Sequence, residues 1–464
     1  MNILAFDIGA SSGRAIIGKY DGEKLTLEEV HRFTNGTTKI REHLYWNIAH
    51  LYSEFQTGIK KAQAICEITS LGIDTWGVDG AFIGANDTLL ALPYGYREFS
   101  PENMEECINK FGAAELYGKT GIQFLPFNTI FQLYKHKKDD NPLLKIAERF
   151  LFIPDYLRFL LTGEKQTEYT IASTGQLLNP HTRNWNPELF EKIGVPMEMM
   201  GKIVESGTFC GTVDGTNIKT VAVAGHDTGS AVVSVPADSS KENWAWMSSG
   251  TWSIMGIETK EPIVSEEGRA ENFSNEGGAY GTIRFCKNIM GMWLEQECRR
   301  IWREENKNYS FAEIKEMVMN SPVNGPVIDT RDLRFMLPDN MIEEIQSACK
   351  ENNQKVPQTE GEILRCVYES LAAAYKQTLD EIISVSGRKI EKLHIVGGGS
   401  QNEMLNQMTA DLCGITVETG PIEGTAIGNL LVQLIANGEL KDMDEARQLV
   451  KASFPTTIYQ PKKN

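Results

Sequence analysis

Cysteines are scarce in this sequence: there are eight in 464 residues, and no two of them form a C-x-x-C pair. Secreted disulfide scaffolds and structural zinc sites need closely spaced cysteines, so neither is encoded here. Reduced thiols are therefore expected. Cys349 and Cys366 flank a polar segment that contains Pro357, and they could form a disulfide if the chain doubles back there. A reducing compartment would favour the free thiols.

Positive charge is also in short supply, and long apolar runs are missing. There are 46 Lys and Arg residues against 62 Asp and Glu, a formal net charge of −16 that opposes binding to nucleic acid. No segment approaches the roughly 20 consecutive apolar residues of a membrane span. Residues 1–4 lead straight into a strand-like pattern, without the basic start of a signal peptide. We therefore expect a soluble, cytoplasmic protein that binds neither nucleic acid nor a membrane, and the sequence leaves its oligomeric state open.

A chain of this length, with 41% hydrophobic residues, can form several domains with sizeable cores. One short pattern occurs twice: strand, Ser-Ser-Gly turn, strand, first at residues 3–18 and again at residues 244–256. The repeat suggests two similar domains that each begin with such a hairpin. We place their boundary in the loop around residues 236–242, which gives expected domains at 1–238 and 239–464.

Two turns have the composition of ligand-binding loops. The first, residues 7–14, has the sequence DIGASSGR, whose small residues leave backbone N–H groups accessible for a phosphate. The second contains Gly397, Gly398 and Gly399, between a strand expected at 392–396 and a helix expected at 403–412. It is either a tight turn or a place where the backbone lies against a flat ligand. Neither turn matches the G-x-G-x-x-G or P-loop fingerprint.

A third polar turn follows a strand expected at residues 221–225. It contains His226, Asp227 and Thr228 and leads into a helix. By itself, Asp227 is typical of an N-cap, which accepts N–H groups of the first helical turn. The same position favours an ionised carboxylate, the form that a general base needs, so both interpretations can hold. An isolated histidine such as His226 is usually a core residue, and its position beside Asp227 is what suggests a function.

Strands and helices alternate along the remaining sequence. The pattern predicts a strand at 70–74, a hairpin at 81–87, and helices at 142–161 and 362–385, the first of which ends at Thr162-Gly163. The charged run 135–140 is typical of a solvated surface. Trp76 and Phe127 are either core residues or rings that face a ligand.

Four features follow one another along the chain: an acidic residue before a hairpin turn of the size of a phosphate, the His-Asp turn, a second such hairpin and the late glycines. This order resembles that of the superfamily that contains actin, Hsp70 and the sugar kinases. Within it, nearly the whole chain resembles the FGGY carbohydrate kinases. The segments that carry the resemblance are DIGASSGR (7–14), GIDTWGVD (72–79), GIQFLPFNT (121–129), HDT (226–228), SGTW (249–252), NEGG (275–278), KNIMG (287–291) and VGGG (396–399). The second, third and seventh of these are typical of the family members that act on L-rhamnulose.

The resemblance implies an α/β fold of two duplicated ribonuclease H-like domains with a cleft between them. It implies Asp227 as the catalytic base. The residues implied for the sugar are Gly77, His226, Asp227, Thr228 and Asn288. The residues implied for ATP are Asp7, Ala10, Ser11, Ser12, Gly13, Arg14, Thr251, Gln296, Gly397, Gly398 and Gly399. Asp7 would also lie near Mg²⁺, through a water molecule.

The activity implied is transfer of the γ-phosphoryl group of ATP to the primary O1 hydroxyl of L-rhamnulose, in sugar catabolism. Such transfer needs exact positioning, a carboxylate that accepts the hydroxyl proton, and Mg²⁺ to neutralise charge on the phosphates. A kinase for L-fuculose or D-xylulose would keep the phosphate-binding residues and differ in the sugar pocket. A non-catalytic ATP-binding protein of the actin or Hsp70 type is the other alternative, and the Asp227 turn and the sugar-side motifs argue against it.

Overall fold

The computed structural model describes residues 1–238, 243–336 and 338–462. The chain forms two compact units, and neither is continuous in sequence. The first combines Met1–Pro236 with Glu258–Phe285 and Gly424–Phe454, and the second combines Ala237–Ile257, Cys286–Glu423 and Pro455–Asn464. The domain boundary expected after Asp238 adjoins residues 239–242, which lie outside the described residues, and it stays a prediction.

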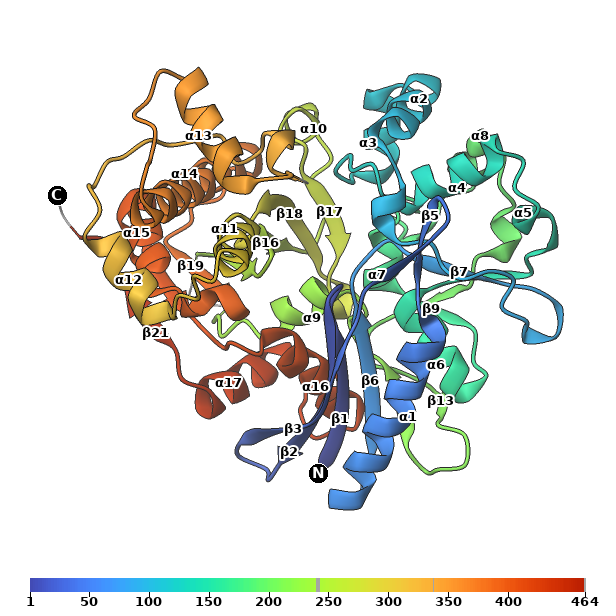
Figure 1. The fold of residues 1–464 in the computed structure, drawn as a ribbon. Coiled ribbons are helices and arrows are strands. Elements are labelled where there is room, and N and C mark those ends of the chain that lie inside the picture. Colours follow the sequence, from blue (N-terminus) through green and yellow to red (C-terminus); the bar gives the residue numbers. More distant parts are fainter. Residues whose placement is uncertain (239–242, 337, 463–464) are drawn as a thin grey trace. The chain divides into compact units, whose positions relative to one another are not determined.

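A six-stranded sheet forms the centre of the first unit, in the order β13-β14-β6-β1-β2-β3 (Figure 1). Its strands are β1 (Asn2–Ile8), β2 (Ser12–Tyr20), β3 (Leu25–Thr34), β6 (Ser70–Thr75), β13 (Thr208–Thr212) and β14 (Lys219–Ala222). β1 and β2 form the predicted antiparallel hairpin, whereas β6 runs parallel to β1 and β14 runs parallel to β6. The carboxyl ends of β1, β6 and β14 therefore meet at one edge of the sheet.

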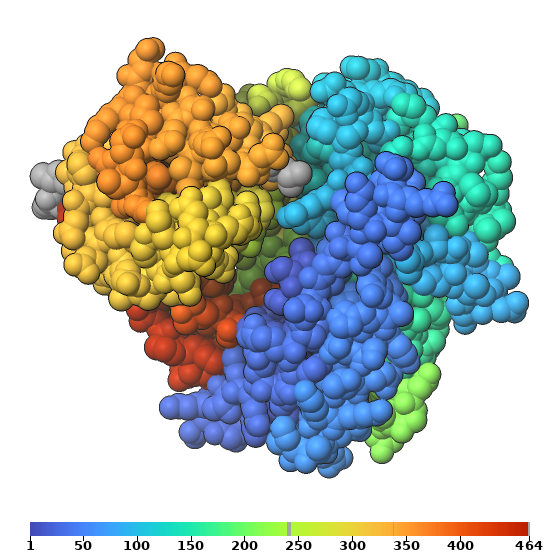
Figure 2. Space-filling model, viewed as in Figure 1, coloured from blue at the N-terminus to red at the C-terminus, as the bar shows by residue number. Residues whose placement is uncertain are grey.

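Helices cover both faces of this sheet, and successive residues of β1 point to opposite faces. Leu4 and Phe6 belong to a core with α1 (Ile48–Ile65) and α6 (Ile153–Thr162). Ile3 and Ala5 belong to another core with α9 (Asp227–Val233) and α16 (Gly424–Ala436). In Figure 2, α1 forms part of the surface on the viewed side. The central strand is apolar on both faces because both are buried.

The first unit also contains smaller strand pairs and further helices. The pairs are β4 (Thr37–Ile40) with β5 (His43–Trp46), β7 (Gly80–Ile83) with β8 (Arg149–Phe152), β9 (Gln166–Glu168) with β12 (Lys202–Val204), and β10 (Leu178–Asn179) with β11 (Asn184–Trp185). The other elements are α2 (Pro101–Phe111), α3 (Ala113–Thr120), α4 (Thr129–Lys138), α5 (Leu143–Ile146), α7 (Tyr169–Ser173), α8 (Pro187–Ile193), α10 (Glu266–Ala270), β17 (Ser274–Gly277) and α17 (Met443–Ser453).

The sheet of the second unit repeats the topology of the first. Its strands are β15 (Trp244–Ser249), β16 (Trp252–Thr259), β18 (Ile283–Met290), β19 (Lys392–Val396), β20 (Thr416–Thr419) and β21 (Thr457–Tyr459), in the order β18-β16-β15-β19-β20-β21. β15 and β16 form an antiparallel hairpin, while β19 runs parallel to β15 and β20 runs parallel to β19. The helices are α11 (Trp293–Glu304), α12 (Phe311–Met319), α13 (Met341–Glu351), α14 (Glu360–Ser386) and α15 (Glu403–Cys413). The prediction of two similar α/β halves, each beginning with a Ser-Ser-Gly hairpin, is confirmed.

Two local predictions are wrong. The single helix predicted at 142–161 is interrupted: α5 ends at Ile146, and β8 precedes α6, which ends at Thr162 with Gly163 as its C-cap, as predicted. Pro154 lies in the first turn of α6, where a proline fits, whereas the interior of a helix excludes it. The strand at 81–84 pairs mainly with β8 rather than with a hairpin partner, and only a single bridge joins Ile83 to Leu89.

None of the eight cysteines, all of which lie within the described residues, forms a disulfide. Cys349 in α13 and Cys366 in α14 are buried, and their Sγ atoms lie 4.0 Å apart, because the chain doubles back between the two helices. Within residues 1–238, 243–336 and 338–462, the structure has no helix that is both long enough and apolar enough to cross a membrane.

Candidate active site

Three carboxylates lie at the edge of the first sheet where β1, β6 and β14 end. Asp7 in β1 is the register partner of Asp74 in β6, and Asp227 begins α9, shortly after β14. Asp7 forms an ion pair with Arg14 at 2.6 Å, across the β1–β2 hairpin. Burial of Asp74, together with the negative charges of Asp7 and Asp227, raises the pKa of Asp74 well above its ordinary value. Asp7, Arg14 and Asp227 thus lie close to Asp74, an acidic residue for which the sequence predicted no role.

Asp74 is held by a residue from the far end of the sequence. Asn429 in α16 donates from Nδ2 to Asp74 Oδ2 at 2.6 Å, and Gln433 donates to Asn429 Oδ1 at 2.8 Å. Gly72 permits this approach, because a Cβ at Gly72 would lie 2.5 Å from Asn429 Oδ1. The other carboxyl oxygen of Asp74, Oδ1, is buried without a hydrogen-bond partner among the described residues. A buried oxygen without a donor favours the protonated, neutral carboxyl.

The Ser-Ser-Gly turn of the first hairpin is closed by its own backbone. The Gly9 N–H donates to the Ser12 carbonyl at 2.9 Å, and Asn35 Nδ2 donates to the Gly9 carbonyl at 2.8 Å. Ser11 is exposed, whereas Ala10 and Ser12 are half-buried. Gly13 is required by packing, because a Cβ there would lie 2.3 Å from the Phe33 ring. The turn therefore presents small residues and backbone beside Arg14, as a phosphate-binding loop requires.

The Asp227 turn differs from the N-cap prediction. His226, with extended φ and ψ of −81° and 124°, occupies the N-cap position, and Asp227 is the first helical residue. Asp227 Oδ1 accepts the Thr228 N–H at 2.5 Å and lies 3.3 Å from His226 Nε2. The Asp227 side chain is 34% exposed, unlike the nearly buried His226. A partly exposed carboxylate, oriented through one oxygen, is suited to accept a proton from a bound hydroxyl.

The buried carboxylate of Glu168 fixes the backbone of this turn. Glu168 Oε2 accepts the N–H of Gly225 at 3.0 Å and also the N–H groups of Thr170 and Ile171, at 2.9 Å and 3.1 Å. The Gly225 carbonyl in turn accepts the Thr75 N–H at 2.9 Å. These hydrogen bonds connect the turn before α9 to both β6 and α7. The backbone next to Asp227 is therefore fixed by two neighbouring elements.

Two further charged residues contact His226. Arg284 Nη2 lies 3.1 Å from His226 Nδ1, and Glu276 Oε2 lies 3.3 Å from the same nitrogen. Arg284 and Glu276 form an ion pair at 3.0 Å, and the Arg284 side chain is fully buried. The resemblance-bearing motif 275–278 includes Glu276, but sequence reasoning gave it no function. An arginine within the otherwise apolar run Ile283-Arg284-Phe285-Cys286 was the available signal.

Gly77 lies in a segment of unusual conformation directly after β6. Its own Cβ position would be 3.2 Å from the Thr174 side chain, and the next residue, Val78, has a φ of 68°. Such a left-handed conformation is rare for a β-branched residue and needs support from its surroundings. Thr174 Oγ1 accepts the Val78 N–H at 3.0 Å, and Thr129 Oγ1 donates to the Val78 carbonyl at 2.6 Å. Segments 72–79 and 121–129, two of those that carry the resemblance, therefore meet here.

Asp79 organises the aromatic residues of the same segment. Its Oδ2 accepts the indole N–H of Trp46 at 2.6 Å and that of Trp76 at 3.0 Å, and its Oδ1 accepts from Gln132 at 3.0 Å. Burial raises the pKa of Asp79 to about 7, although these donors oppose the shift. The Trp76 ring packs against that of Trp46 at an angle of 35° and is 6% exposed, which favours the core interpretation of this ring. Phe127 is half-buried, and its ring packs against Tyr96.

In the second unit, the residues expected at the nucleotide gather around the second Ser-Ser-Gly hairpin. Thr251 Oγ1 donates to Gln296 Oε1 at 3.2 Å. Gly397, with a φ of 90°, and Gly399 both lie against Ser249. A Cβ on Gly397 would be 2.8 Å from the Ser249 carbonyl oxygen, and a Cβ on Gly399 would be 2.0 Å from Ser249 Oγ. A Cβ on Gly398 would meet nothing within 4 Å. Asn288 is half-buried on β18.

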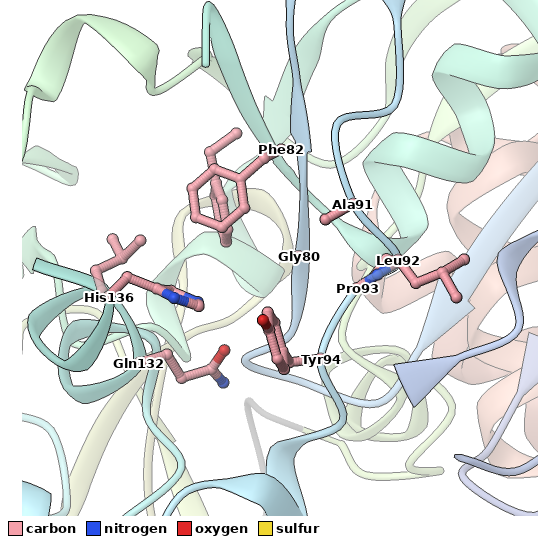
Figure 3. A pocket seen from close by; sticks show the side chains of 10 residues that line it. Gly80, Phe82, Ala91, Leu92, Pro93, Tyr94, Gln132 and His136 are labelled. Atoms are coloured by element: carbon pink, nitrogen blue, oxygen red, sulfur yellow. The ribbon is translucent and has the colours of Figure 1, made fainter. Parts of the chain in front are cut away.

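The first unit also contains a small cavity, which Gly80, next to Asp79, helps to line (Figure 3). Its volume is about 10 Å³, enough for about one water molecule, and its lining includes Tyr94, Gln132 and His136. Burial lowers the pKa of His136 to about 4, and the rings of Phe82 and Tyr94 pack beside it. Within the run 135–140, predicted to be solvated, His136 is therefore an exception, while 137–140 are exposed.

Comparison with known proteins identifies the family. The model of the FGGY family of carbohydrate kinases, N-terminal domain, matches residues 2–243, and that of the C-terminal domain matches residues 245–437. The chain belongs to the FGGY family of carbohydrate kinases. It is 43% identical to a rhamnulokinase of Bacteroides thetaiotaomicron over 470 residues, which cover 99% of this chain and 96% of that protein. A rhamnulokinase of Enterococcus faecalis is also 43% identical, with 98% and 94% covered.

Solved structures confirm the fold. The crystal structure of gluconate kinase from Lactobacillus acidophilus is similar, with a TM-score of 0.80 at 15% sequence identity, over 99% of this chain and 94% of that one. At this level of identity the likeness concerns the fold alone. The duplicated α/β architecture expected from the sequence is thus the architecture of sugar kinases.

Proposed function

We propose that this protein is an ATP-dependent rhamnulokinase, which transfers the γ-phosphoryl group of ATP to O1 of L-rhamnulose. Membership of the carbohydrate kinase family gives the reaction class, and full-length identity of 43% to rhamnulokinases supports the sugar. The observation that carries the chemistry is the partly exposed carboxylate of Asp227, fixed at the carboxyl edge of the first sheet. Ligands of open α/β sheets bind at this edge.

In this proposal Asp227 is the general base. Its Oδ1 is held by the Thr228 N–H, so the proton of the O1 hydroxyl goes to Oδ2. As the bond from O1 to the γ-phosphorus forms, the bond from that phosphorus to the bridging oxygen breaks, and ADP leaves with the electron pair. The partial positive charge at the start of α9 stabilises the negative charge on Asp227.

The phosphates of ATP are assigned to two turns. In the first unit these are Ala10, Ser11, Ser12, Gly13 and Arg14, whose small residues and backbone can approach an anion. In the second unit Thr251 and Gln296, which already share a hydrogen bond, and Gly397, Gly398 and Gly399 are assigned to the nucleotide. The open space beside Gly398 is consistent with a ring that lies against the backbone. Asp7 is assigned to the metal-bound phosphates.

The residues at this edge fit a magnesium ion that arrives with ATP better than a metal held by the protein alone. Among the described residues, no group of three or more His, Cys, Asp or Glu side chains could hold a metal. Mg²⁺ in kinases typically uses one or two carboxylates, waters and the substrate phosphates, and Asp7 can supply one such carboxylate. When bound, Mg²⁺ neutralises charge on the transferred phosphoryl group.

The sugar is assigned to Gly77, His226, Thr228 and Asn288, together with Asp227. Gly77 offers backbone in a segment that the hydrogen bonds of Thr129 and Thr174 to Val78 keep rigid. His226 places an imidazole beside the base, at 3.3 Å from Asp227 Oδ1. A deoxy ketose presents hydroxyls to such polar groups and an apolar face to aromatic rings.

The test is a panel of ketoses in an assay that couples ADP release to an optical signal. We expect the highest kcat/KM for L-rhamnulose, compared with L-fuculose and D-xylulose at one saturating MgATP concentration. A higher kcat/KM for another ketose would contradict the assignment of the sugar. ATP binding without turnover on any ketose would contradict the kinase itself.

A further inference from the structure

The buried ion pair of Arg284 and Glu276 lies beside Nδ1 of His226, whereas Nε2 of the same ring lies beside Asp227. Arg284 extends from the start of β18, and its Nε donates to the Gly277 carbonyl at 2.8 Å. Its Nη2 lies 3.1 Å from His226 Nδ1 and 3.0 Å from Glu276 Oε2. Arg284 is fully buried and Glu276 is 5% exposed, so neither charge is screened by solvent. All these residues belong to the first unit.

The contact with Arg284 determines which nitrogen of His226 carries the proton. A guanidinium has hydrogen-bond donors and no acceptor, so Nδ1 of His226 must accept. The imidazole is then neutral with its proton on Nε2. Nε2 is the nitrogen that lies 3.3 Å from Asp227 Oδ1. The geometry therefore aims an N–H at one oxygen of the carboxylate.

Glu276 keeps Arg284 in this place. A buried arginine without a counter-charge is strongly unfavourable, and Glu276 supplies that charge. Although burial opposes ionisation of Glu276, the positive charge of Arg284 outweighs it and lowers the pKa of Glu276 to about 2. Glu276 Oε2 is also 3.3 Å from His226 Nδ1, where it would attract a proton if Arg284 were absent. Arg284 therefore favours the tautomer with the proton on Nε2, and Glu276 favours the one with the proton on Nδ1. Because the contact with Arg284 has hydrogen-bond geometry, we expect the Nε2–H tautomer.

We propose that Arg284, held by Glu276, is a positioning residue that fixes His226 as the Nε2–H tautomer and thereby orients the carboxylate of Asp227. This inference rests on the proposed role of Asp227 as the base. With Oδ1 engaged by His226 and Thr228, Oδ2 is directed to the reacting hydroxyl. Loss of the tautomer would allow the carboxylate to rotate and would misplace the proton acceptor.

The direct test is the ¹⁵N NMR spectrum of protein labelled at histidine, because protonated and unprotonated ring nitrogens differ in chemical shift. The chain has seven histidines, so the signals of His226 are assigned by their loss in His226→Asn. We expect a protonated Nε2 and an unprotonated Nδ1 in the native protein. In Arg284→Met the proton should move to Nδ1, under the influence of Glu276, and in Arg284→Lys, which keeps a donor, it should stay on Nε2.

Kinetics of the same variants connect the tautomer to the reaction. Misplacement of a reacting group by about 1 Å can cost on the order of 10²-fold, and we expect a fall of this size in kcat for Arg284→Met, with KM for ATP unchanged. The double variant Glu276→Gln/Arg284→Met removes both buried charges together. It covers the case in which the single variant does not fold. Its kcat should also be low, because Nδ1 has lost its charged donor.

A matched control is another ion pair of the same unit, between half-buried Glu258 and buried Arg447, which lie 2.9 Å apart. Arg447 also reaches the Val232 carbonyl, at the other end of α9. Glu258→Gln/Arg447→Met should lose stability but keep the His226 tautomer and kcat.

Two results would overturn the proposal: a protonated Nδ1 in the native protein, or a folded Arg284 variant that changes the tautomer without lowering kcat. Near-normal kcat in Asp227→Asn would instead refute the base, and the NMR result would still decide whether Arg284 controls His226.

Discussion

Asp7 and Asp74 are register partners in the adjacent parallel strands β1 and β6, at the carboxyl edge of the first sheet. Side chains of such partners lie on the same face, so two acidic groups share one small region. Arg14 pairs with Asp7, while Asp74 is fully buried beneath and accepts from Asn429. The charge of Asp7 therefore adds to the effect of burial in raising the pKa of Asp74. Asp7 is therefore the ion-pairing carboxylate of the two, whereas Asp74 tends to keep its proton.

Replacing Asp227 by Asn tests the proposed base. The amide has the same size, and its oxygen can still accept the Thr228 N–H, so we expect little loss of stability. An amide cannot take up the O1 proton, so kcat should fall by on the order of 10²–10⁴, with little change in ATP binding. The measurement is kcat at saturating L-rhamnulose and MgATP beside the Tm. Asp214→Asn, at an exposed turn of the same unit, is the control, and near-normal kcat in Asp227→Asn would reduce Asp227 to a structural residue.

Gly398→Leu tests the assignment of the nucleotide. A side chain at Gly398 would project into open space, so the variant should fold normally, as circular dichroism can check. If adenosine lies against Gly398, the leucine should raise KM for ATP and leave the KM for the sugar nearly unchanged. The control is Glu403→Leu, at an exposed position on α15 of the same unit. Gly414 also faces open space, but its φ of 68° would strain a leucine. An unchanged KM for ATP would remove Gly398 from the site.

The raised pKa of Asp79 predicts how stability depends on pH. The folded-state pKa is about 7 and the ordinary value is 3.8, so the folded protein binds the proton more tightly than the unfolded chain. The contribution of Asp79 is therefore fully present below about pH 4 and is lost as the pH rises to about 7, at a total cost on the order of 4 kcal/mol. Asp79→Asn keeps an acceptor for the two indoles but does not titrate. We expect the free energy of unfolding of the native protein, relative to this variant, to decrease between pH 5 and pH 7 in urea titrations; a constant difference would be inconsistent with burial of an ionisable Asp79.

Gly428→Ala tests the contact between α16 and α9. A Cβ at Gly428 would lie 1.7 Å from the Ser230 carbonyl oxygen, so the helices must move apart, which also shifts Asn429 away from Asp74. We expect a loss of about 3 kcal/mol or more in the free energy of unfolding. Gly118→Ala is the matched control, because Gly118 lies within α3 with nothing near its Cβ position, and alanine there should stabilise by about 0.5–1 kcal/mol. Equal effects of the two changes would mean that the helices do not approach so closely.

Much of the local structure around the candidate site could be predicted, because the candidate residues lie in short turns between strongly patterned elements. The segment 7–14 lies between two apolar strands, and Asp227 lies between a strand and a helix. In such places the local sequence is sufficient to place the turn and its polar residues, although the element ends around Asp227 differ from the prediction by a few residues. The turn at Gly397 and Gly399 is predicted from the sequence for the same reason. Only the structure shows why both positions need glycine: a side chain at either one would collide with Ser249. The assignment of ligands to these turns came from the family resemblance and stays to be tested.

The tertiary structure alone decided which distant segments complete the site. Asn429 reaches Asp74, and Arg284 reaches His226, across long stretches of sequence, and no local periodicity encodes such pairs. For the same reason β8 was mistaken for helix: its apolar residues fit either pattern, and the presence of β7 as a partner decided in favour of a strand. The sequence by itself determined where the polar turns lie, because hydrophobic pattern and turn chemistry are local. Only folding determined the charges around them, because burial and proximity, which shift the pKa values and fix the tautomer, arise when separate segments pack together.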